Sequence, residues 1–149
     1  MEADKKIIIY TDGGSRGNPG PAALGVAIYR ADGMSIKSYG EALGTKTNNE
    51  AEYLAVVSGL KKVKVLFGKN RVKKMHIEVR LDSELVKKQL SGEYHIEQEH
   101  LFPFFMSIWN LRIDFAGVVF VHIPREKNKE ADRMVNEALD GKGQEALWP

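Results

Sequence analysis

The chain has 149 residues, of which 43% are hydrophobic and 28% charged, with a formal net charge of +2. That length suits one domain with a substantial core, and no apolar run is long enough for a membrane span or a signal peptide. Because cysteine is absent, disulfides and thiolate metal sites are excluded. So small a net charge does not by itself indicate nucleic acid. We therefore expect a soluble, cytoplasmic protein with no membrane association.

The first third of the chain predicts three strands. Residues 6–11 are apolar on both faces, which is typical of a central strand in a covered sheet. Residues 24–30 and 35–43 are two further strands, and Ala31, Asp32 and Gly33 between them form a hairpin signal. The three strands predict an antiparallel meander.

The rest of the chain alternates helices and strands. Thr47 and Glu50 match a capping box, which begins a helix ending near residue 67. The later elements are, in chain order, a strand at 75–81, a helix at 84–90, a helix at 97–111 that is disturbed or started at Pro103, a strand at 115–123 and a helix at 128–139. The order βββαβααβα predicts an α/β domain with a mixed five-stranded sheet and helices on both faces. We expect one domain over 1–140 and a short C-terminal tail over 141–149.

Four acidic residues are candidates for a functional site. Asp12 and Asp82 end predicted strands, whereas Glu52 and Asp132 border the apolar stripes of predicted helices near their starts. Each has a simple structural reading: a turn residue for Asp12, an N-cap for Asp82 and a first-turn acid for the other two. The alternative to these separate structural roles is that all four acids converge at one site, because sites in α/β sheets form beyond the carboxyl ends of strands. Their repulsion would then favour a bound cation, and oxygen ligands alone select Mg²⁺ or Mn²⁺.

Four segments, in chain order, carry a resemblance to a known family. "TDGGSRGNPGPAALG", "TNNEAEY", "DSELV" and "PREKNKEADRMVNEA" resemble the motifs of type 1 ribonuclease H, and the resemblance spans nearly the whole chain. It implies a ribonuclease H-like fold and an endonuclease that cuts the RNA strand of RNA/DNA hybrids, leaving 5′-phosphate and 3′-hydroxyl ends. It also implies that two Mg²⁺ ions, or Mn²⁺ in their place, lie about 3.5–4 Å apart at the scissile phosphate. The implied catalytic and metal-binding residues are Asp12, Glu52, Asp82 and Asp132.

The same resemblance implies contacts to the hybrid. RNA presents its 2′-hydroxyls in a wide minor groove, where short polar side chains can read them. The contacts carry over onto Gly13, Ser15, Asn18, Thr47, Asn48 and Asn49, for which turn and cap chemistry is the alternative reading. Glu84 belongs to this set and stands where many members carry glutamine. Glutamate can accept a hydrogen bond from a 2′-hydroxyl but cannot donate one.

The segment before the last acid departs from the bacterial pattern. "IPRE" resembles the shortened loop of archaeal-type members, which implies Arg125 as the group near the scissile phosphate. The alternative is His122 as a group that assists catalysis, and otherwise His122 is a partly buried strand histidine. The seven lysines and arginines within residues 61–74 are either a solvated face or an auxiliary duplex contact. The aromatic run Phe102, Phe104, Phe105, Ile108 and Trp109 is interpreted as core.

Two other functions stay open at this point. One is a binding module for hybrids or duplexes that kept the fold and lost turnover, and the other is a nuclease that also cuts double-stranded RNA. In each case the expected partner is nucleic acid. We expect a monomer with no obligatory protein partner.

Overall fold

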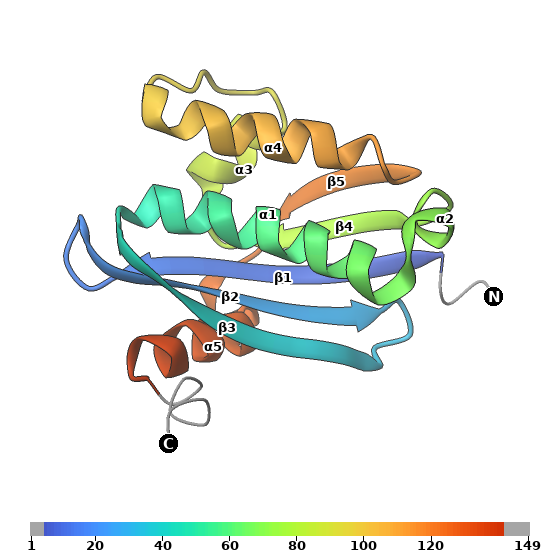
Figure 1. The fold of residues 1–149 in the computed structure, drawn as a ribbon, viewed down its shortest axis with the longest axis horizontal. Helices are drawn as coiled ribbons and strands as arrows, with labels where there is room; N and C mark the ends of the chain where they lie inside the picture. The colour runs from blue at the N-terminus through green and yellow to red at the C-terminus, as the bar shows by residue number, and fades with distance from the viewer. Residues whose placement is uncertain (1–4, 142–149) are drawn as a thin grey trace.

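The computed structural model describes residues 5–141, so the predicted tail lies, apart from Gly141, outside the described residues. Five strands form one sheet in the order β3-β2-β1-β4-β5 (Figure 1). Their bounds are β1 Lys6–Ser15, β2 Gly20–Arg30, β3 Ser35–Lys46, β4 His76–Leu81 and β5 Gly117–His122. β1, β2 and β3 pair antiparallel, whereas β4 pairs parallel to both β1 and β5. The predicted meander and mixed sheet are confirmed.

Within residues 5–141, five helices accompany the sheet: α1 Asn48–Phe67, α2 Lys69–Val72, α3 Glu84–Leu90, α4 Phe102–Arg112 and α5 Lys129–Leu139. The short α2 was not expected from the sequence. The helix predicted at 97–111 begins only at Phe102, after a 3₁₀ turn at Glu99–Leu101. Pro103 lies in its first turn, where a residue without an N–H group is tolerated because that group has no intrahelical acceptor. None of the helices within residues 5–141 has the length and apolar character needed to span a membrane.

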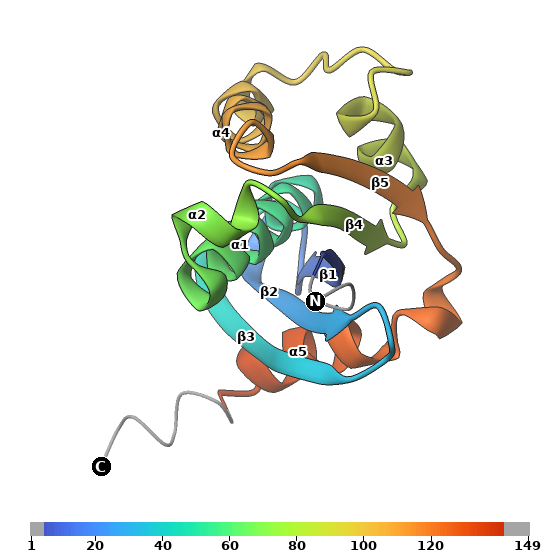
Figure 2. The same cartoon turned by 90° about the vertical axis from the view of Figure 1, so that its right-hand side faces the viewer.

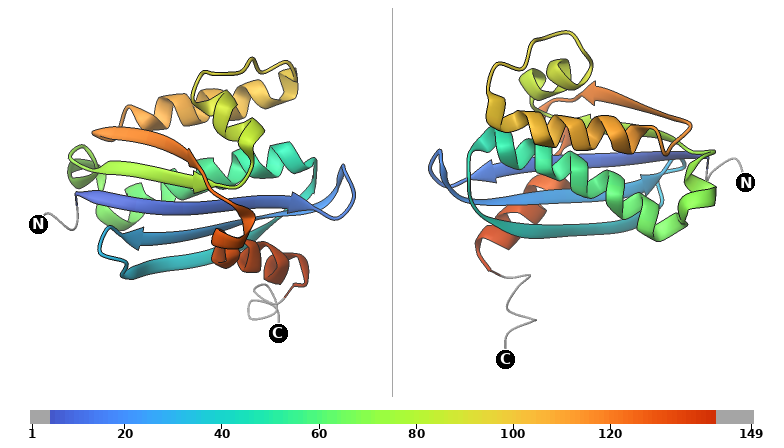
Figure 3. Two further views of the ribbon diagram at one scale, coloured as in Figure 1. Left: turned by 180° about the vertical axis from the view of Figure 1, so that it is seen from behind. Right: turned by 45° about the horizontal axis from the view of Figure 1, so that its top comes forward.

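The helices cover both faces of the sheet (Figures 2 and 3). α1 and α4 lie side by side on one face, and α5 lies on the other. The main core forms between the sheet and α1, with fully buried side chains such as Ile9, Val26 and Leu60. A smaller cluster, which includes Ala23 and Val135, lies beneath α5.

The aromatic run on α4 is only partly core. Ile108 is buried, but Phe102 is 47% exposed and Trp109 41% exposed, so the core interpretation is wrong for these two rings. α4 packs on α1 along one side only, and its other side faces solvent. There Trp109 stacks on Phe105, and the Arg112 guanidinium lies 3.4 Å from the Trp109 ring centroid. This cation–π contact shields part of the exposed ring.

Two glycines let the helices approach the sheet next to the acids. A Cβ atom on Gly13 would lie 2.2 Å from the backbone carbon of Ala51, and one on Gly25 would lie 2.1 Å from the carbonyl oxygen of Ala131. Any side chain at either position would push the helix away. The contacts fall directly before Glu52 on α1 and Asp132 on α5. The close packing therefore sets how far these acids reach over the sheet.

Candidate metal centre

The four acids predicted from the sequence come to one end of the sheet. β1 and β4 are parallel neighbours in which Thr11 pairs with Leu81, so the next residue of each chain segment, Asp12 and Asp82, lies at the same edge. Carboxylate oxygens of Asp12, Glu52 and Asp82 lie within 4.8 Å of one another. Asp132, from the first turn of α5, lines the same cleft of about 470 Å³.

Burial makes this cluster electrostatically unfavourable when it is ionised. Asp12 is 8% exposed and Glu52 7% exposed. Burial, and then the neighbouring charge of Asp82, raises the pKa of Asp12 to about 7. Burial, and then the charge of Asp12, holds the pKa of Glu52 well above its ordinary range. Ionising these acids together would therefore confine several negative charges in a partly desolvated space, which a bound cation would relieve.

The hydrogen bonds of the cluster leave an oxygen unused. The Gly13 N–H group donates to Asp12 Oδ1 at 3.0 Å and to Glu52 Oε1 at 3.2 Å. Glu52 Oε2 is buried and has no hydrogen-bond partner among the described residues. A buried carboxylate oxygen without a partner carries a desolvation cost. Oxygen donors of this kind, without cysteine or histidine beside them, fit a hard divalent cation such as Mg²⁺ or Mn²⁺.

The glycine-rich loop is tied to the first turn of α1. Asn48 Oδ1 accepts hydrogen bonds from the Ser15 N–H group at 2.9 Å and from the Ser15 hydroxyl at 3.1 Å. Asn18 Oδ1 in turn accepts from the Asn48 N–H group at 3.0 Å. The predicted capping box is confirmed, because Thr47 and Glu50 each accept from the backbone N–H group of the other. These bonds fix the loop beside the acids.

The other predicted site residues divide into two groups. Those that line the cleft together with the acids are Gly13, Ser15, Asn48, Asn49 and Arg125. Those that lie outside its lining are Asn18, Thr47, Glu84 and His122. His122 is exposed at the end of β5, and the Glu84 side chain is 62% exposed beside Lys88.

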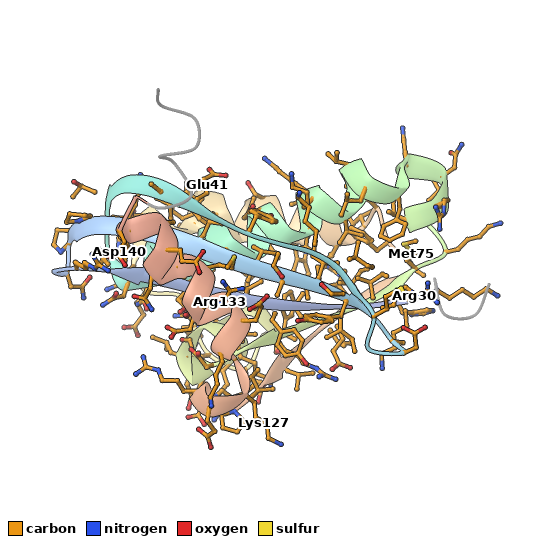
Figure 4. All side chains as sticks on the ribbon, turned by 90° about the horizontal axis from the view of Figure 1, so that it is seen from below. Arg30, Glu41, Met75, Lys127, Arg133 and Asp140 are labelled. Atoms are coloured by element: carbon orange, nitrogen blue, oxygen red, sulfur yellow. The ribbon has the colours of Figure 1, made fainter. Side chains whose placement is uncertain are left out.

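An ion pair joins Arg16, which lines the cleft, to the end of α5. Arg16 donates to Asp140 at 2.7 Å, which links the β1–β2 loop to the end of α5. Figure 4 looks onto this face, with Asp140 at the end of α5, Arg133 along the helix and Lys127 before its start. Both partners are about half exposed, so the pair contributes little to stability on its own.

Sequence reasoning missed Asn128 and misjudged the cap of α3. Asn128 is 1% exposed, and its amide nitrogen donates to Asp82 Oδ2 at 3.1 Å and to the Thr11 carbonyl at 2.9 Å. In the sequence it reads only as the start of the last helix. Ser83, not Asp82, caps α3 by accepting from the Val86 N–H group at 3.2 Å. The N-cap reading of Asp82 is therefore wrong, and its carboxylate faces the cluster.

The basic segment 61–74 lies at the opposite end of α1. Most of its side chains are exposed, although Lys64 pairs with Asp114 at 2.6 Å and Lys62 lies over the Tyr39 ring. At about 1.5 Å per residue, α1 is roughly 30 Å long. The segment is therefore far from the acids and contributes no group to the cleft.

A mixed sheet of this order, with acids converging from β1, β4, α1 and α5, defines a ribonuclease H-like domain. The chain belongs to the type 1 ribonuclease H family: residues 10–138 match the family model described as reverse transcriptase-like, and solved structures that are 37% and 43% identical to it bear the family's name. Family membership agrees with the four motifs and with the observed sheet.

Three relatives illustrate the similarity. The crystal structure of RNase H1 from Halobacterium salinarum is 37% identical, with a TM-score of 0.84 over 91% of this chain and 98% of that one. LC11-RNase H1 in complex with an RNA/DNA hybrid is 42% identical, with a TM-score of 0.86 over 91% of this chain and 98% of that one. The bifunctional protein Rv2228c of Mycobacterium tuberculosis is 35% identical over 95% of this chain, which spans 37% of that protein's length.

Proposed function

We propose that this protein is a metal-dependent endonuclease that hydrolyses the RNA strand of RNA/DNA hybrids. The observation that carries the proposal is the cluster of Asp12, Glu52 and Asp82, whose carboxylate oxygens lie within 4.8 Å of one another and include a carboxylate with a buried oxygen that has no hydrogen-bond partner among the described residues, Glu52 Oε2. The structural similarity to LC11-RNase H1, which was crystallised with an RNA/DNA hybrid, supports the substrate class. The nuclease domain is assigned to residues 1–140.

Asp12, Glu52, Asp82 and Asp132 would hold two Mg²⁺ ions, with Mn²⁺ as a substitute. Such ions would supply an activated water and charge neutralisation at the leaving oxygen, and cleavage would leave 5′-phosphate and 3′-hydroxyl ends. Asp12 accepts from Gly13 through Oδ1 and faces both β4 and α1. Asp12 would therefore hold a cation together with both Glu52 and Asp82.

The hybrid is read by the loop and the first turn of α1. Because Asn48 Oδ1 is occupied by Ser15, the Asn48 amide nitrogen is left to donate to a 2′-hydroxyl or to a base edge in the minor groove. Asn49 lines the cleft beside it. Gly13, Asn18 and Thr47 complete this surface, and Glu84 adds an acceptor at the start of α3.

Arg125 contacts the scissile phosphate or its neighbour. Its place in the cleft lining supports this role, and a guanidinium binds phosphate oxygens in a bidentate manner. His122 is the alternative assisting group, although it lies outside the lining and would reach the substrate only from the end of β5. The two side chains can be separated by mutation.

A binding module without turnover is the rival function. Glu52 and Asp12 argue against it, because a protein that only binds phosphates gains nothing from buried carboxylates facing them. The basic side chains of segment 61–74 form a solvent-exposed face and are not assigned a contact with the hybrid. The monomeric state, the lack of an obligatory protein partner and the cytoplasmic location stay predictions.

The test is cleavage of end-labelled RNA/DNA hybrid, double-stranded RNA and double-stranded DNA, each with Mg²⁺, Mn²⁺ or a chelator. We expect metal-dependent cutting of the RNA strand of the hybrid, lost in Asp12→Asn and retained in the surface variant Asp114→Asn. Binding of the hybrid without cleavage in either metal would refute the nuclease and favour the binding module. Equal cutting of double-stranded RNA would widen the substrate class and contradict hybrid selectivity.

A further inference from the structure

Asn128 joins the segments that carry three of the four acids. Its amide nitrogen donates to Asp82 Oδ2 at 3.1 Å and to the carbonyl of Thr11 at 2.9 Å, directly before Asp12. Its own backbone carbonyl accepts the N–H group of Asp132 at 3.1 Å. One buried residue therefore connects the ends of β1 and β4 with the first turn of α5.

The usual role of an asparagine at this position does not account for these contacts. Asparagine before a helix commonly caps it by accepting a backbone N–H group through its side chain. Asn128 makes no such bond to α5. Its Oδ1 atom is buried and has no hydrogen-bond partner among the described residues. An amide whose acceptor oxygen is unpaired stabilises a fold less than an amide that makes all its hydrogen bonds. The role of Asn128 is therefore explained by the two hydrogen bonds that its amide nitrogen donates.

The hydrogen bond that the Asn128 amide nitrogen donates orients the carboxylate of Asp82, one of the proposed metal ligands. The terminal torsion of an aspartate is soft and broad, so a carboxylate held by nothing else samples many orientations. Asn128 engages Oδ2 of Asp82 and thereby leaves Oδ1 for the cleft. The same amide is anchored to the backbone of β1 through Thr11. Asn128 therefore fixes the orientation of the Asp82 carboxylate relative to β1, the strand that carries Asp12.

We propose that Asn128 is a positioning residue of the metal centre, which fixes the rotation of the Asp82 carboxylate relative to Asp12 and so preorganises the acids for a divalent cation. The inference deepens the proposed function and rests on it. Groups that orient metal ligands in this way typically affect metal affinity or activity 10–100-fold when they are removed. Asn128 is not among the residues that line the cleft.

The test compares Asn128 with a buried amide outside the cleft lining, whose hydrogen bonds join it to Tyr53 and His95 rather than to one of the four acids. Gln89 is 7% exposed, accepts from the Tyr53 hydroxyl at 2.7 Å and donates to the His95 carbonyl at 3.3 Å. Asn128→Ala and Asn128→Leu remove the donor with and without loss of volume, and Gln89→Ala and Gln89→Leu are the matched pair. Each folded variant is titrated with Mn²⁺ alone by calorimetry. The Mg²⁺ concentration for half-maximal hybrid cleavage and the KM for hybrid at saturating Mg²⁺ are then measured.

We expect both Asn128 variants to bind Mn²⁺ about 10-fold or more weakly and to need correspondingly more Mg²⁺, with little change in KM for hybrid. The Gln89 variants should lose thermal stability but keep wild-type metal affinity. Wild-type metal affinity in either folded Asn128 variant would overturn the inference. Equal weakening in the Gln89 pair would overturn it as well, since general destabilisation would then explain the loss. A wild-type protein that neither binds metal nor cleaves hybrid would instead refute the proposed function.

Discussion

Replacing Asp12 by asparagine should abolish hybrid cleavage and at the same time stabilise the metal-free fold at alkaline pH. The pKa of Asp12 is raised from 3.8 to about 7 by burial and by Asp82. The folded protein therefore binds more protons than the unfolded chain between about pH 4 and pH 7, so its free energy of unfolding falls as the pH rises through that window. At about 1.4 kcal/mol per pH unit, full ionisation at pH 8 costs on the order of 4 kcal/mol.

Asparagine removes the charge but retains an Oδ1 acceptor for the Gly13 N–H group. Burying a neutral amide is also unfavourable, and this offsets part of the free energy gained by removing the buried charge. We therefore expect a net stabilisation of roughly 2 kcal/mol at pH 8. For a chain of this length that is a rise in Tm of about 4–8 °C. At pH 4, where the wild-type carboxyl is protonated, the two proteins should unfold at nearly the same temperature.

The assay is thermal unfolding with a chelator present, at pH 4 and pH 8. Asp114→Asn, which breaks a partly exposed pair with Lys64, is the control and should lower stability by less than about 1 kcal/mol at pH 8. Addition of Mg²⁺ should then stabilise the wild type and not Asp12→Asn, because only the wild type binds the ion in its folded state. A metal-free Asp12→Asn that is no more stable than the wild type at pH 8 would refute the electrostatic reasoning.

Three further predictions follow from individual contacts. Gly13→Ala should unfold at a clearly lower temperature than Gly14→Ala, because a Cβ on Gly13 meets the α1 backbone at 2.2 Å whereas one on Gly14 meets only a side-chain methyl at 3.9 Å; similar melting temperatures would contradict the close packing. Arg125→Ala should slow single-turnover cleavage by at least about 10-fold while His122→Ala should not, and the reverse result would transfer the role to the histidine. Thr47→Ala should cost about 1 kcal/mol in chemical denaturation through loss of the cap, and an unchanged denaturation midpoint would argue that the capping box adds nothing.

The strands and α1 could be predicted because their signals are local. The apolar run of β1 and the Thr47–Glu50 capping box each lie within a few neighbouring residues. The predicted ends of the strands were less accurate. β1 continues from the predicted end at residue 11 to Ser15, which pairs with Ala22. Glycines here read as a turn in the sequence, whereas pairing with β2 keeps the backbone extended.

The acids could be predicted as candidates, but the contacts that organise them could not. Asn128 and Thr11 are 117 residues apart in sequence, so no local pattern connects them. The close approach at Gly25 likewise depends on how α5 lies on the sheet. The exposed rings of α4 were misjudged for the same reason. Hydrophobicity predicts that Trp109 has a packed side, but only the arrangement of α4 on α1 decides which side that is.

The claim that the converging acids hold divalent cations can be tested by anomalous diffraction from crystals soaked in Mn²⁺. We expect anomalous density in the cleft, bounded by the carboxylates of Asp12, Glu52 and Asp82, with Asp132 at its side. The same soak of Asp12→Asn crystals should show this density reduced or lost. A well-ordered wild-type cleft without anomalous density at saturating Mn²⁺ would contradict the claim, and with it the proposed nuclease.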